Sequence, residues 1–242
     1  MAPSTHPASF GGSRVAFFGG SFDPPHRGHI AIAGAAQRAL RLDTVLFAPV
    51  GSQPLKPSGS TAGFEDRVAM TRLAIAGDPA FALSLVDAPS ANHAPNYTID
   101  TLHALRAQLP AGGMLFCLIG ADSFLSLARW HRGADIPFAA PLIVASRPGQ
   151  SLGDLASVLP AGLSLDQQTA ATAGSGSDTL VTMTLRNAAG AQAPFYLLPG
   201  LHVDISATEV RCQVRAEAAS TGTPPGLAPS VAAYIAAHRL YR

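Results

Sequence analysis

The sequence predicts an α/β protein with a doubly wound, mainly parallel sheet, helices on both faces of the sheet and further helices at the C-terminal end. Short apolar runs alternate with segments of helical periodicity, which is the pattern of repeated βαβ units. Three polar clusters follow apolar runs, and in parallel sheets such clusters meet at the carboxyl edge of the strands. The strands are expected at residues 15–18, 44–50, 81–86, 114–119, 141–146 and 195–198.

The expected helices fill most of the intervals between these strands. Acidic residues stand near the start of the helical segment at 64–76, where the helix dipole favours them. The run at 114–119 is the most continuous apolar stretch, so we expect a central strand that is covered on both faces. The helices are expected at residues 30–40, 64–76, 97–109, 206–218 and 229–238, with a further short helix that follows residues 120–122 and runs through residue 127.

The 242-residue chain has the composition of a packed globular protein, with 48% hydrophobic and 13% charged residues. Its formal net charge of +1 provides no global basic field, which argues against a nucleic-acid partner. No apolar run is long enough for a membrane span, and the first residues lack the features of a signal peptide. We therefore expect a cytoplasmic protein with no membrane partner. Cys117 and Cys212 have no metal-ligand spacing and are interpreted as core or near-core residues.

The chain is expected to form one domain at residues 14–242, preceded by a disordered tail at residues 1–13. Residues 160–194 are dominated by Gly, Ala, Ser and Thr, so they predict a flexible insertion with little to bury. The alternation at residues 179–185 allows one edge hairpin with residues 193–198.

A glycine-rich turn at residues 19–29 connects the first expected strand to the first helix. Gly19 and Gly20 let the backbone turn sharply and approach a ligand, because neither carries a Cβ. The helix that follows offers unpaired N–H groups and a positive dipole end to an anion. His26 and His29 stand three residues apart, so both imidazoles can face one phosphate. The pattern predicts nucleotide binding by a turn that is neither a P-loop nor a dinucleotide fingerprint, and an ordinary α/β turn is the alternative.

A second anion site is predicted at residues 205–211. Ser206 is a candidate N-cap with Glu209 three residues on, which is a capping-box arrangement. Thr208 supplies a hydroxyl, and Arg211 supplies a forked guanidinium one turn inside the helix, well shaped for phosphate oxygens. Standing alone, this segment would more often be an ordinary capped helix with an exposed arginine.

Two further residues, Asp122 and Trp130, are candidates for ligand contacts. Asp122 follows the central strand, where its carboxylate can accept hydrogen bonds from ribose hydroxyls; capping of the next helix is the alternative, and both can hold. Trp130 is the only tryptophan, and standing alone such a residue is more often core than ligand platform.

Two motifs resemble those of the nucleotidylyltransferase superfamily. Residues 19–29 resemble its G-x-F-D-P-x-H-x-G-H signature, and residues 205–211 resemble its second motif, I-S-x-T-x-x-R. The two motifs stand in the superfamily's chain order. Their resemblance implies a Rossmann-like nucleotide-binding domain.

Three other segments are similar to the nicotinate-nucleotide adenylyltransferase family within this superfamily. The first is Gly-Ala-Asp-Ser at 120–123 followed by Trp-His-Arg at 130–132, and the second is Pro-Asn-Tyr-Thr at 95–98. The third is the C-terminal pattern at residues 229–241. Together with the two motifs, the resemblance covers roughly residues 15–146 and 195–242.

The resemblance implies an enzyme that transfers AMP from ATP to nicotinate mononucleotide, forming nicotinate adenine dinucleotide and pyrophosphate in NAD synthesis. It implies Mg²⁺ bound through the substrate phosphates, with no metal ligand from the protein. The implied catalytic residues are His26, His29 and Arg211. The implied ATP-binding residues are Gly19, Gly20, Ser21, Phe22, His26, His29, Gly120, Asp122, Ile205, Ser206, Thr208 and Arg211. The implied residues for nicotinate mononucleotide are Ser21, Lys56, Tyr97, Thr98, Trp130 and His131.

Alternatives stay open at this point. A related nucleotidyltransferase would use nicotinamide mononucleotide or another phosphate acceptor, and a catalytically silent nucleotide sensor would keep the same fold. Leu55 stands where relatives often carry a histidine or another polar group, and Lys56 beside it is either a phosphate contact or a solvated loop residue. The sequence leaves the oligomeric state open.

Overall fold

The computed structural model describes residues 13–56, 59–92, 94–146, 152–173, 179–199, 205–216 and 224–242. Residues 1–12 of the expected tail and residues 174–178 of the expected insertion lie outside these ranges. Within the described ranges, no helix combines the length and the apolar character that a membrane span requires.

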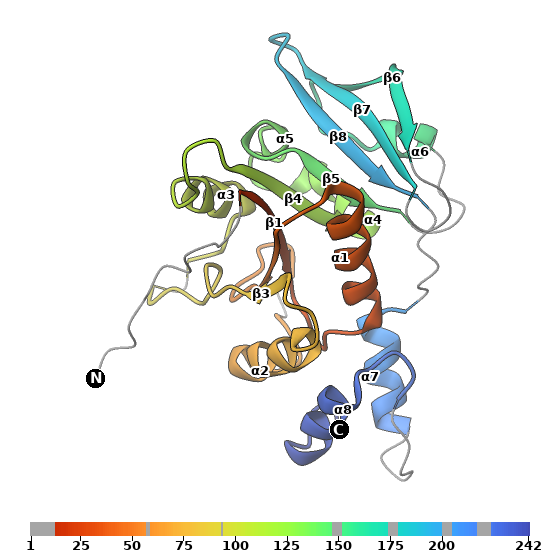
Figure 1. Ribbon diagram of the computed structural model, residues 1–242. Helices are drawn as coiled ribbons and strands as arrows, with labels where there is room; N and C mark the ends of the chain where they lie inside the picture. Colours follow the sequence, from red (N-terminus) through yellow and green to blue (C-terminus); the bar gives the residue numbers. More distant parts are fainter. Residues whose placement is uncertain are drawn as a thin grey trace.

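An eight-stranded sheet forms the centre of the fold, in the order β3-β2-β1-β4-β5-β8-β7-β6 (Figure 1). The strands from β3 to β8 in that order pair in parallel, β7 pairs antiparallel with β8, and β6 pairs antiparallel with β7. The predicted mainly parallel, doubly wound fold is therefore confirmed. The strands are β1 (Arg14–Gly20), β2 (Thr44–Pro49), β3 (Phe81–Leu83), β4 (Met114–Gly120), β5 (Leu142–Ala145), β6 (Leu163–Ala173), β7 (Leu180–Asn187) and β8 (Gln192–Leu198).

The helices connect the strands and cover the sheet, as Figure 1 shows for α1 in front of the strands. Strand order reverses between β1 and β4, and a doubly wound sheet opens its ligand crevice at such a point. The helices are α1 (Arg27–Leu40), α2 (Phe64–Ile75), α3 (Thr98–Arg106), α4 (Ala121–Phe124), the 3₁₀ turn η1 (Leu127–Arg129), α5 (Ile136–Ala139), α6 (Leu152–Ser157), α7 (Ala207–Ala216) and α8 (Pro229–Ala237).

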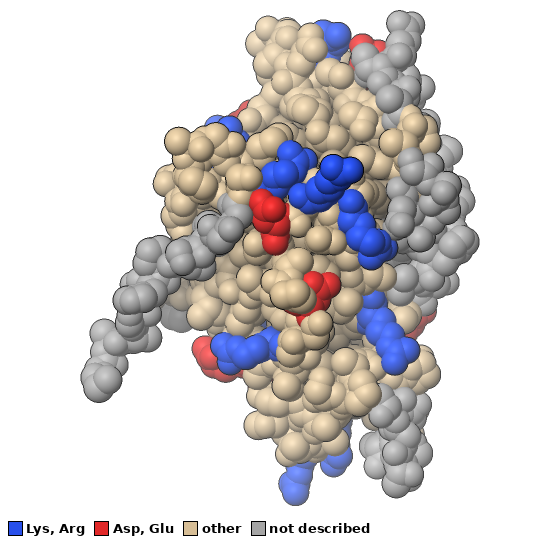
Figure 2. Space-filling view, viewed as in Figure 1, with Lys and Arg blue, Asp and Glu red and all other residues tan. Residues whose placement is uncertain are grey.

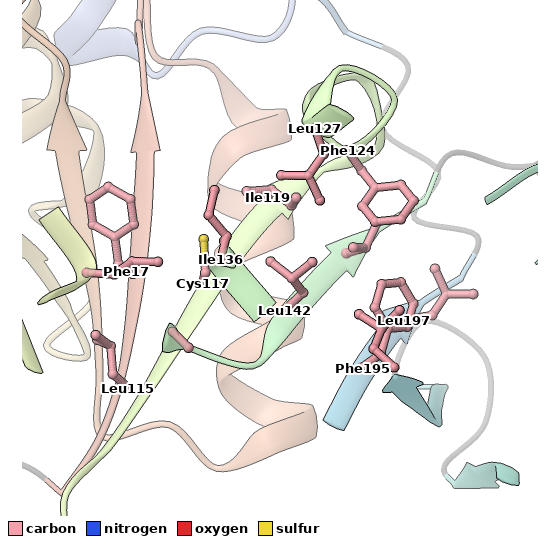
Figure 3. Packing of buried hydrophobic residues seen from close by; sticks show 14 of the residues in the cluster. Phe17, Leu115, Cys117, Ile119, Phe124, Leu127, Ile136, Leu142, Phe195 and Leu197 are labelled. Atoms are coloured by element: carbon pink, nitrogen blue, oxygen red, sulfur yellow. The ribbon is translucent and has the colours of Figure 1, made fainter. Parts of the chain in front are cut away.

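Two cores lie on opposite faces of the sheet, because successive side chains of a strand point to opposite sides. Phe17 and Cys117 belong to the core that also contains Leu102 of α3 and Ile136 of α5, part of which is drawn in Figure 3. Phe18 belongs to the other core, beneath the alanine-rich face of α1. Burial on both faces explains why β1 and β4 are continuous apolar runs.

The expected flexible loop at residues 160–194 does not hold for the described part of that segment. Leu163–Ala173 pairs with β7, and β7 pairs with β8, so this region adds two antiparallel strands to the sheet. The hairpin of β7 and β8 matches the expected pairing, but β6 rather than β7 is the edge strand. Burial of alternate residues of β7, including Met183 and Leu185, provides the apolar face that the composition obscured. All eight strands share one sheet, which supports our proposal that residues 14–242 form one domain.

A third core joins α2 to the two C-terminal helices α7 and α8. Met70 of α2, Val210 of α7 and Val231 of α8 are buried together, and Tyr241 packs into the same cluster. In Figure 1 these three helices lie together at the bottom of the molecule, with the C-terminus beside α8. This core fixes α7, which carries the second predicted anion motif, against the body of the protein.

Candidate active site

A cavity of about 810 Å³ opens at the carboxyl ends of β1 and β4. It lies where the strand order reverses, as expected for an open α/β sheet. The structure brings every sequence-predicted site residue to its wall: Gly19, Gly20, Ser21, Phe22, His26, His29, Lys56, Tyr97, Thr98, Gly120, Asp122, Trp130, His131, Ile205, Ser206, Thr208 and Arg211. The predicted convergence of the polar clusters at one sheet edge is thus observed.

The turn after β1 sets the positions of its two histidines. His26 is the N-cap residue of α1, and its backbone N–H donates to Nδ1 of His29 at 3.2 Å. The two rings lie 3.8 Å apart between centroids. Because Nδ1 of His29 accepts this hydrogen bond, the ring proton of neutral His29 is on Nε2, which is left as a hydrogen-bond donor.

Two aromatic side chains pack against His29. The rings of Phe22 and Phe18 lie 5.0 and 6.1 Å from its ring between centroids. Phe22 is itself buried and has a left-handed backbone conformation with φ of 47°. Burial, followed by the nearby charge of His26, lowers the pKa of His29 well below its usual value of 6.5. At neutral pH, His29 is therefore a neutral donor rather than a cation.

The helix α7 presents the second anion motif. The hydroxyl and N–H of Ser206 donate to a carboxylate oxygen of Glu209 at 2.9 and 2.8 Å, and Glu209 N–H donates back to the hydroxyl at 3.2 Å. The predicted capping box is confirmed, and it engages both donors of Ser206. Arg211 donates from Nη1 to the backbone carbonyl of Asp23 at 2.7 Å and from Nη2 to the hydroxyl of Thr208 at 3.1 Å. The guanidinium is thereby held at the cavity wall beside the turn.

Ser21 and Lys56 meet on another part of the wall. Lys56 Nζ donates to the hydroxyl of Ser21 at 2.9 Å, and that hydroxyl donates to the side-chain oxygen of Gln53 at 3.0 Å. Desolvation lowers the pKa of Lys56, although the nearby charge of Asp23 opposes the shift. A hydroxyl and an ammonium group side by side are suited to a phosphate.

The next part of the wall combines a helix N-terminus with aromatic rings. Thr98 is the first residue of α3, so its N–H is among those without a partner inside the helix. The rings of Tyr97 and His131 lie 4.3 Å apart, and Trp130 Nε1 donates to the hydroxyl of Ser126 at 2.9 Å. An anionic planar ligand can therefore find both an anion-binding helix end and flat apolar surfaces here.

Asp122 lies in the first turn of α4, directly after β4. Gly120 is the N-cap residue of that helix, so Asp122 stands two residues inside it rather than at the N-cap position. The carboxylate is at the cavity wall, where hydroxyl groups of a ligand can reach it.

A buried frame of residues that sequence reasoning missed holds the turn in place. Arg67 is 2% exposed and donates to the backbone carbonyls of Ser21, Val50 and Ala62 at 2.7, 2.8 and 3.3 Å. Its pKa is lowered, chiefly by desolvation. Arg67 gave no sequence signal, since its partners are backbone carbonyls, two of them 17 and 46 residues away in the chain.

Asp87 is a second missed residue, buried at the cavity wall in the loop after β3. The hydroxyl of Thr101 donates to its Oδ1 at 2.5 Å. Burial raises the pKa of Asp87 to about 6, and the hydrogen bond from Thr101 partly offsets that rise. Gln53 and Asp23 also line the cavity, and only Asp23 had a signal, because it stands inside the first motif.

Charged side chains of both signs are scattered over the face of the molecule drawn in Figure 2. The face shown in Figure 2 carries basic and acidic side chains among a larger uncharged area. Among the described residues, no three His, Cys, Asp or Glu side chains are grouped so that they could hold a metal ion.

The strand order, the histidine turn at the end of β1 and the helix α7 beside that turn together define a nucleotidyltransferase. The family model described as "Cytidylyltransferase-like" matches residues 17–213. A protein of Pelobacter propionicus named "Probable nicotinate-nucleotide adenylyltransferase" is 36% identical over 228 residues, which are 94% of this chain and 98% of the relative. A protein of the same name from Laribacter hongkongensis is 37% identical over 229 residues, 94% of either chain.

Solved structures show the same fold at lower identity. The Plasmodium falciparum nicotinic acid mononucleotide adenylyltransferase complexed with NaAD aligns with a TM-score of 0.65 and 14% identity, covering 95% of this chain and 98% of that one. The protein described here belongs to the cytidylyltransferase-like family, among its nicotinate-nucleotide adenylyltransferases.

Proposed function

We propose that this enzyme transfers the AMP group of ATP to nicotinate mononucleotide, giving nicotinate adenine dinucleotide and pyrophosphate, a step in NAD synthesis. One observation carries the proposal: a single cavity joins the histidine turn, the Arg211 helix and the aromatic wall at the start of α3. The names of the relatives support the same acceptor. The cytoplasmic location expected from the sequence belongs to the same proposal.

The proposed reaction needs no nucleophile from the protein. An oxygen of the mononucleotide phosphate forms a bond to the α-phosphorus of ATP, while the bond from that phosphorus to the bridging oxygen of pyrophosphate breaks. The electron pair of the broken bond leaves with pyrophosphate. The protein contributes by holding the two phosphates in line and by stabilising charge on their oxygens.

The turn and α7 would divide the triphosphate between them. His26 and His29 would donate to phosphate oxygens near the reacting phosphorus, with Nε2 of neutral His29 as one donor. Arg211 and Thr208 would hold the β and γ end. Ser206 would contribute mainly by fixing the start of α7, since Glu209 occupies its hydroxyl and N–H. Gly19, Gly20, Phe22, Gly120 and Ile205 would shape the ATP side of the cavity, with Asp122 on the ribose.

The acceptor would occupy the opposite wall. Ser21 and Lys56 are adjacent, as a phosphate site requires. The N-terminus of α3 at Thr98 offers backbone donors to the pyridine carboxylate, and Trp130 and the ring pair of Tyr97 and His131 offer flat surfaces to the pyridine.

The proposed Mg²⁺ would be carried by the substrate phosphates. The cavity wall fits that arrangement, because it carries the side chains of His26, Lys56 and Arg211, and no three His, Cys, Asp or Glu side chains of the described residues are grouped as metal ligands. When bound, the ion would neutralise negative charge on the phosphate oxygens.

The test is pyrophosphate release from ATP by the purified full-length chain with Mg²⁺ and one acceptor at a time: nicotinate mononucleotide, nicotinamide mononucleotide or phosphopantetheine. We expect nicotinate mononucleotide to give the highest kcat/KM, with nicotinate adenine dinucleotide identified by chromatography. Higher kcat/KM with another acceptor would overturn the proposed substrate, and no pyrophosphate with any acceptor would favour a nucleotide sensor.

The role of His29 is tested in the same assay. We expect His29→Ala to lower kcat at least a hundredfold, about 2.7 kcal/mol of transition-state stabilisation. His103→Ala, which changes an exposed histidine of α3, is the matched control and should stay within twofold of the unsubstituted protein. A loss below tenfold in His29→Ala would rule out the proposed phosphate contact.

A further inference from the structure

The second-last residue of the chain reaches the turn that starts the active site. Tyr241 is 5% exposed, and its hydroxyl donates to Oδ1 of Asp23 at 2.7 Å across a separation of 218 residues. The sulfur of Met70 lies 4.0 Å from the same hydroxyl. The hydrogen bond from a buried phenol to a buried carboxylate is strong, because water does not compete for either group.

Asp23 connects that hydrogen bond to the anion site. Its other carboxylate contacts are the N–H groups of Thr61 and Ala62, at 2.6 and 3.1 Å. Its backbone carbonyl accepts the 2.7 Å hydrogen bond from Nη1 of Arg211. The position of this carbonyl therefore sets where the guanidinium lies, and the carboxylate contacts set the position of the carbonyl.

The C-terminal residues also support Arg211 from its other side. Tyr241 packs in the core that contains Val210, the neighbour of Arg211 in α7, together with Val231 and Ile235 of α8. Burial and the hydrogen bond to Asp23 raise the pKa of Tyr241, so the phenol is protonated and is a donor at neutral pH.

We propose that Tyr241 is a positioning residue for the triphosphate: its hydroxyl fixes Asp23, and Asp23 in turn fixes Arg211 in the orientation that binds ATP. The docked C-terminal segment is thus part of the ATP site without touching the substrate. This inference rests on the proposed contact between Arg211 and ATP.

The first experiment compares Tyr241→Phe with Tyr234→Phe in the full-length protein. The first variant keeps the ring in the core and removes only the hydroxyl. The control removes the partly buried hydrogen bond from Tyr234 to Asp66 Oδ1, which is 3.0 Å long and does not involve Asp23. We expect Tyr241→Phe to raise the KM for ATP at least fivefold while the KM for nicotinate mononucleotide stays within twofold. Tyr234→Phe should leave both constants within twofold.

A double-mutant cycle tests the route through Arg211. If Tyr241 acts by orienting this guanidinium, Tyr241→Phe should change the KM for ATP by less than twofold once Arg211→Lys is already present. Two results would overturn the inference: Tyr241→Phe within twofold of the unsubstituted protein in every constant, or an equal loss with and without Arg211→Lys.

ATP binding without any acceptor separates this inference from the proposed function. Calorimetric titration with ATP and Mg²⁺ should show at least fivefold weaker binding for Tyr241→Phe than for Tyr234→Phe, whatever acceptor the enzyme uses. Equal ATP affinities of these two variants would refute the positioning role even if nicotinate mononucleotide proves to be the substrate. Failure of nicotinate mononucleotide in the acceptor panel, with this affinity difference intact, would refute only the proposed function.

Discussion

The buried carboxyl of Asp87 makes the stability of this protein depend on pH in a direction opposite to that of an ordinary surface carboxylate. Its pKa is about 6 in the folded protein, against a usual value of 3.8. Because the folded pKa is the higher one, the folded state holds the proton more tightly than the unfolded chain does. The contribution to stability is fully present below pH 3.8 and is lost as the pH rises through about 6.

The size of the effect follows from the two pKa values. A difference of roughly 2 units corresponds to about 3 kcal/mol between strongly acidic and neutral solution. Between pH 5.0 and pH 7.5, the same two values give a loss of about 1.4 kcal/mol in the free energy of unfolding. Asp87→Asn keeps a side-chain oxygen as an acceptor for the hydroxyl of Thr101 and removes the ionisation.

Urea denaturation at pH 5.0 and pH 7.5 measures this contribution. Since the remaining titratable groups are common to both proteins, the stability of Asp87→Asn relative to the unsubstituted protein should rise by about 1.4 kcal/mol from the lower to the higher pH. Thr101→Val provides a second check, because loss of its hydroxyl removes the hydrogen bond that lowers the pKa of Asp87, and the pH dependence should become steeper. A difference between Asp87→Asn and the unsubstituted protein that is the same at both pH values would refute the reasoning.

Two other residues give direct tests of the site and its frame. Lys56 is the sole lysine of the chain, and its lowered pKa favours the reactive neutral amine. Because the acceptor phosphate would cover this amine, nicotinate mononucleotide should slow its acylation at least fivefold, as measured by mass spectrometry of the peptide. No protection would contradict the acceptor-phosphate role. Arg67→Met should lower the free energy of unfolding by about 3 kcal/mol in urea, because three buried carbonyls lose their donor. The exposed Arg72 of the same helix is the control, and Arg72→Met should cost less than about 0.5 kcal/mol.

Local patterns were enough to predict the parallel strands of the sheet and the positions of the turn after β1 and of the capped helix α7. The apolar runs that became β1 and β4 are buried on both faces, so their periodicity and their burial agree. The capping box of Ser206 and Glu209 was readable because its partners are three residues apart. Such signals are contained within a few residues of sequence.

The failures have a physical cause as well. The segment that contains β7 looks poor in core-forming side chains, yet threonine suits a strand, and β7 buries only every second residue, with Val181, Met183 and Leu185 on its apolar face. Arg67 bonds backbone carbonyls of three separate segments, and no pattern of residue types encodes a bond to a carbonyl. Asp87 owes its pKa to burial, which depends on what the fold packs over it.

The contacts of Arg67 and Tyr241 determine how firmly the histidine turn is held. A glycine-rich turn is flexible by itself, so sequence alone would assign its rigidity to the helix that follows. In the structure, Arg67 donates a hydrogen bond to the backbone carbonyl of Ser21, and Tyr241 donates one to the carboxylate of Asp23. Both residues that flank Phe22 are therefore held by groups that are far away in the chain. The ring of Phe22, in turn, packs against the ring of His29. The orientation of the His29 imidazole, which we propose as a phosphate donor, therefore depends on residues that lie far from it in the chain.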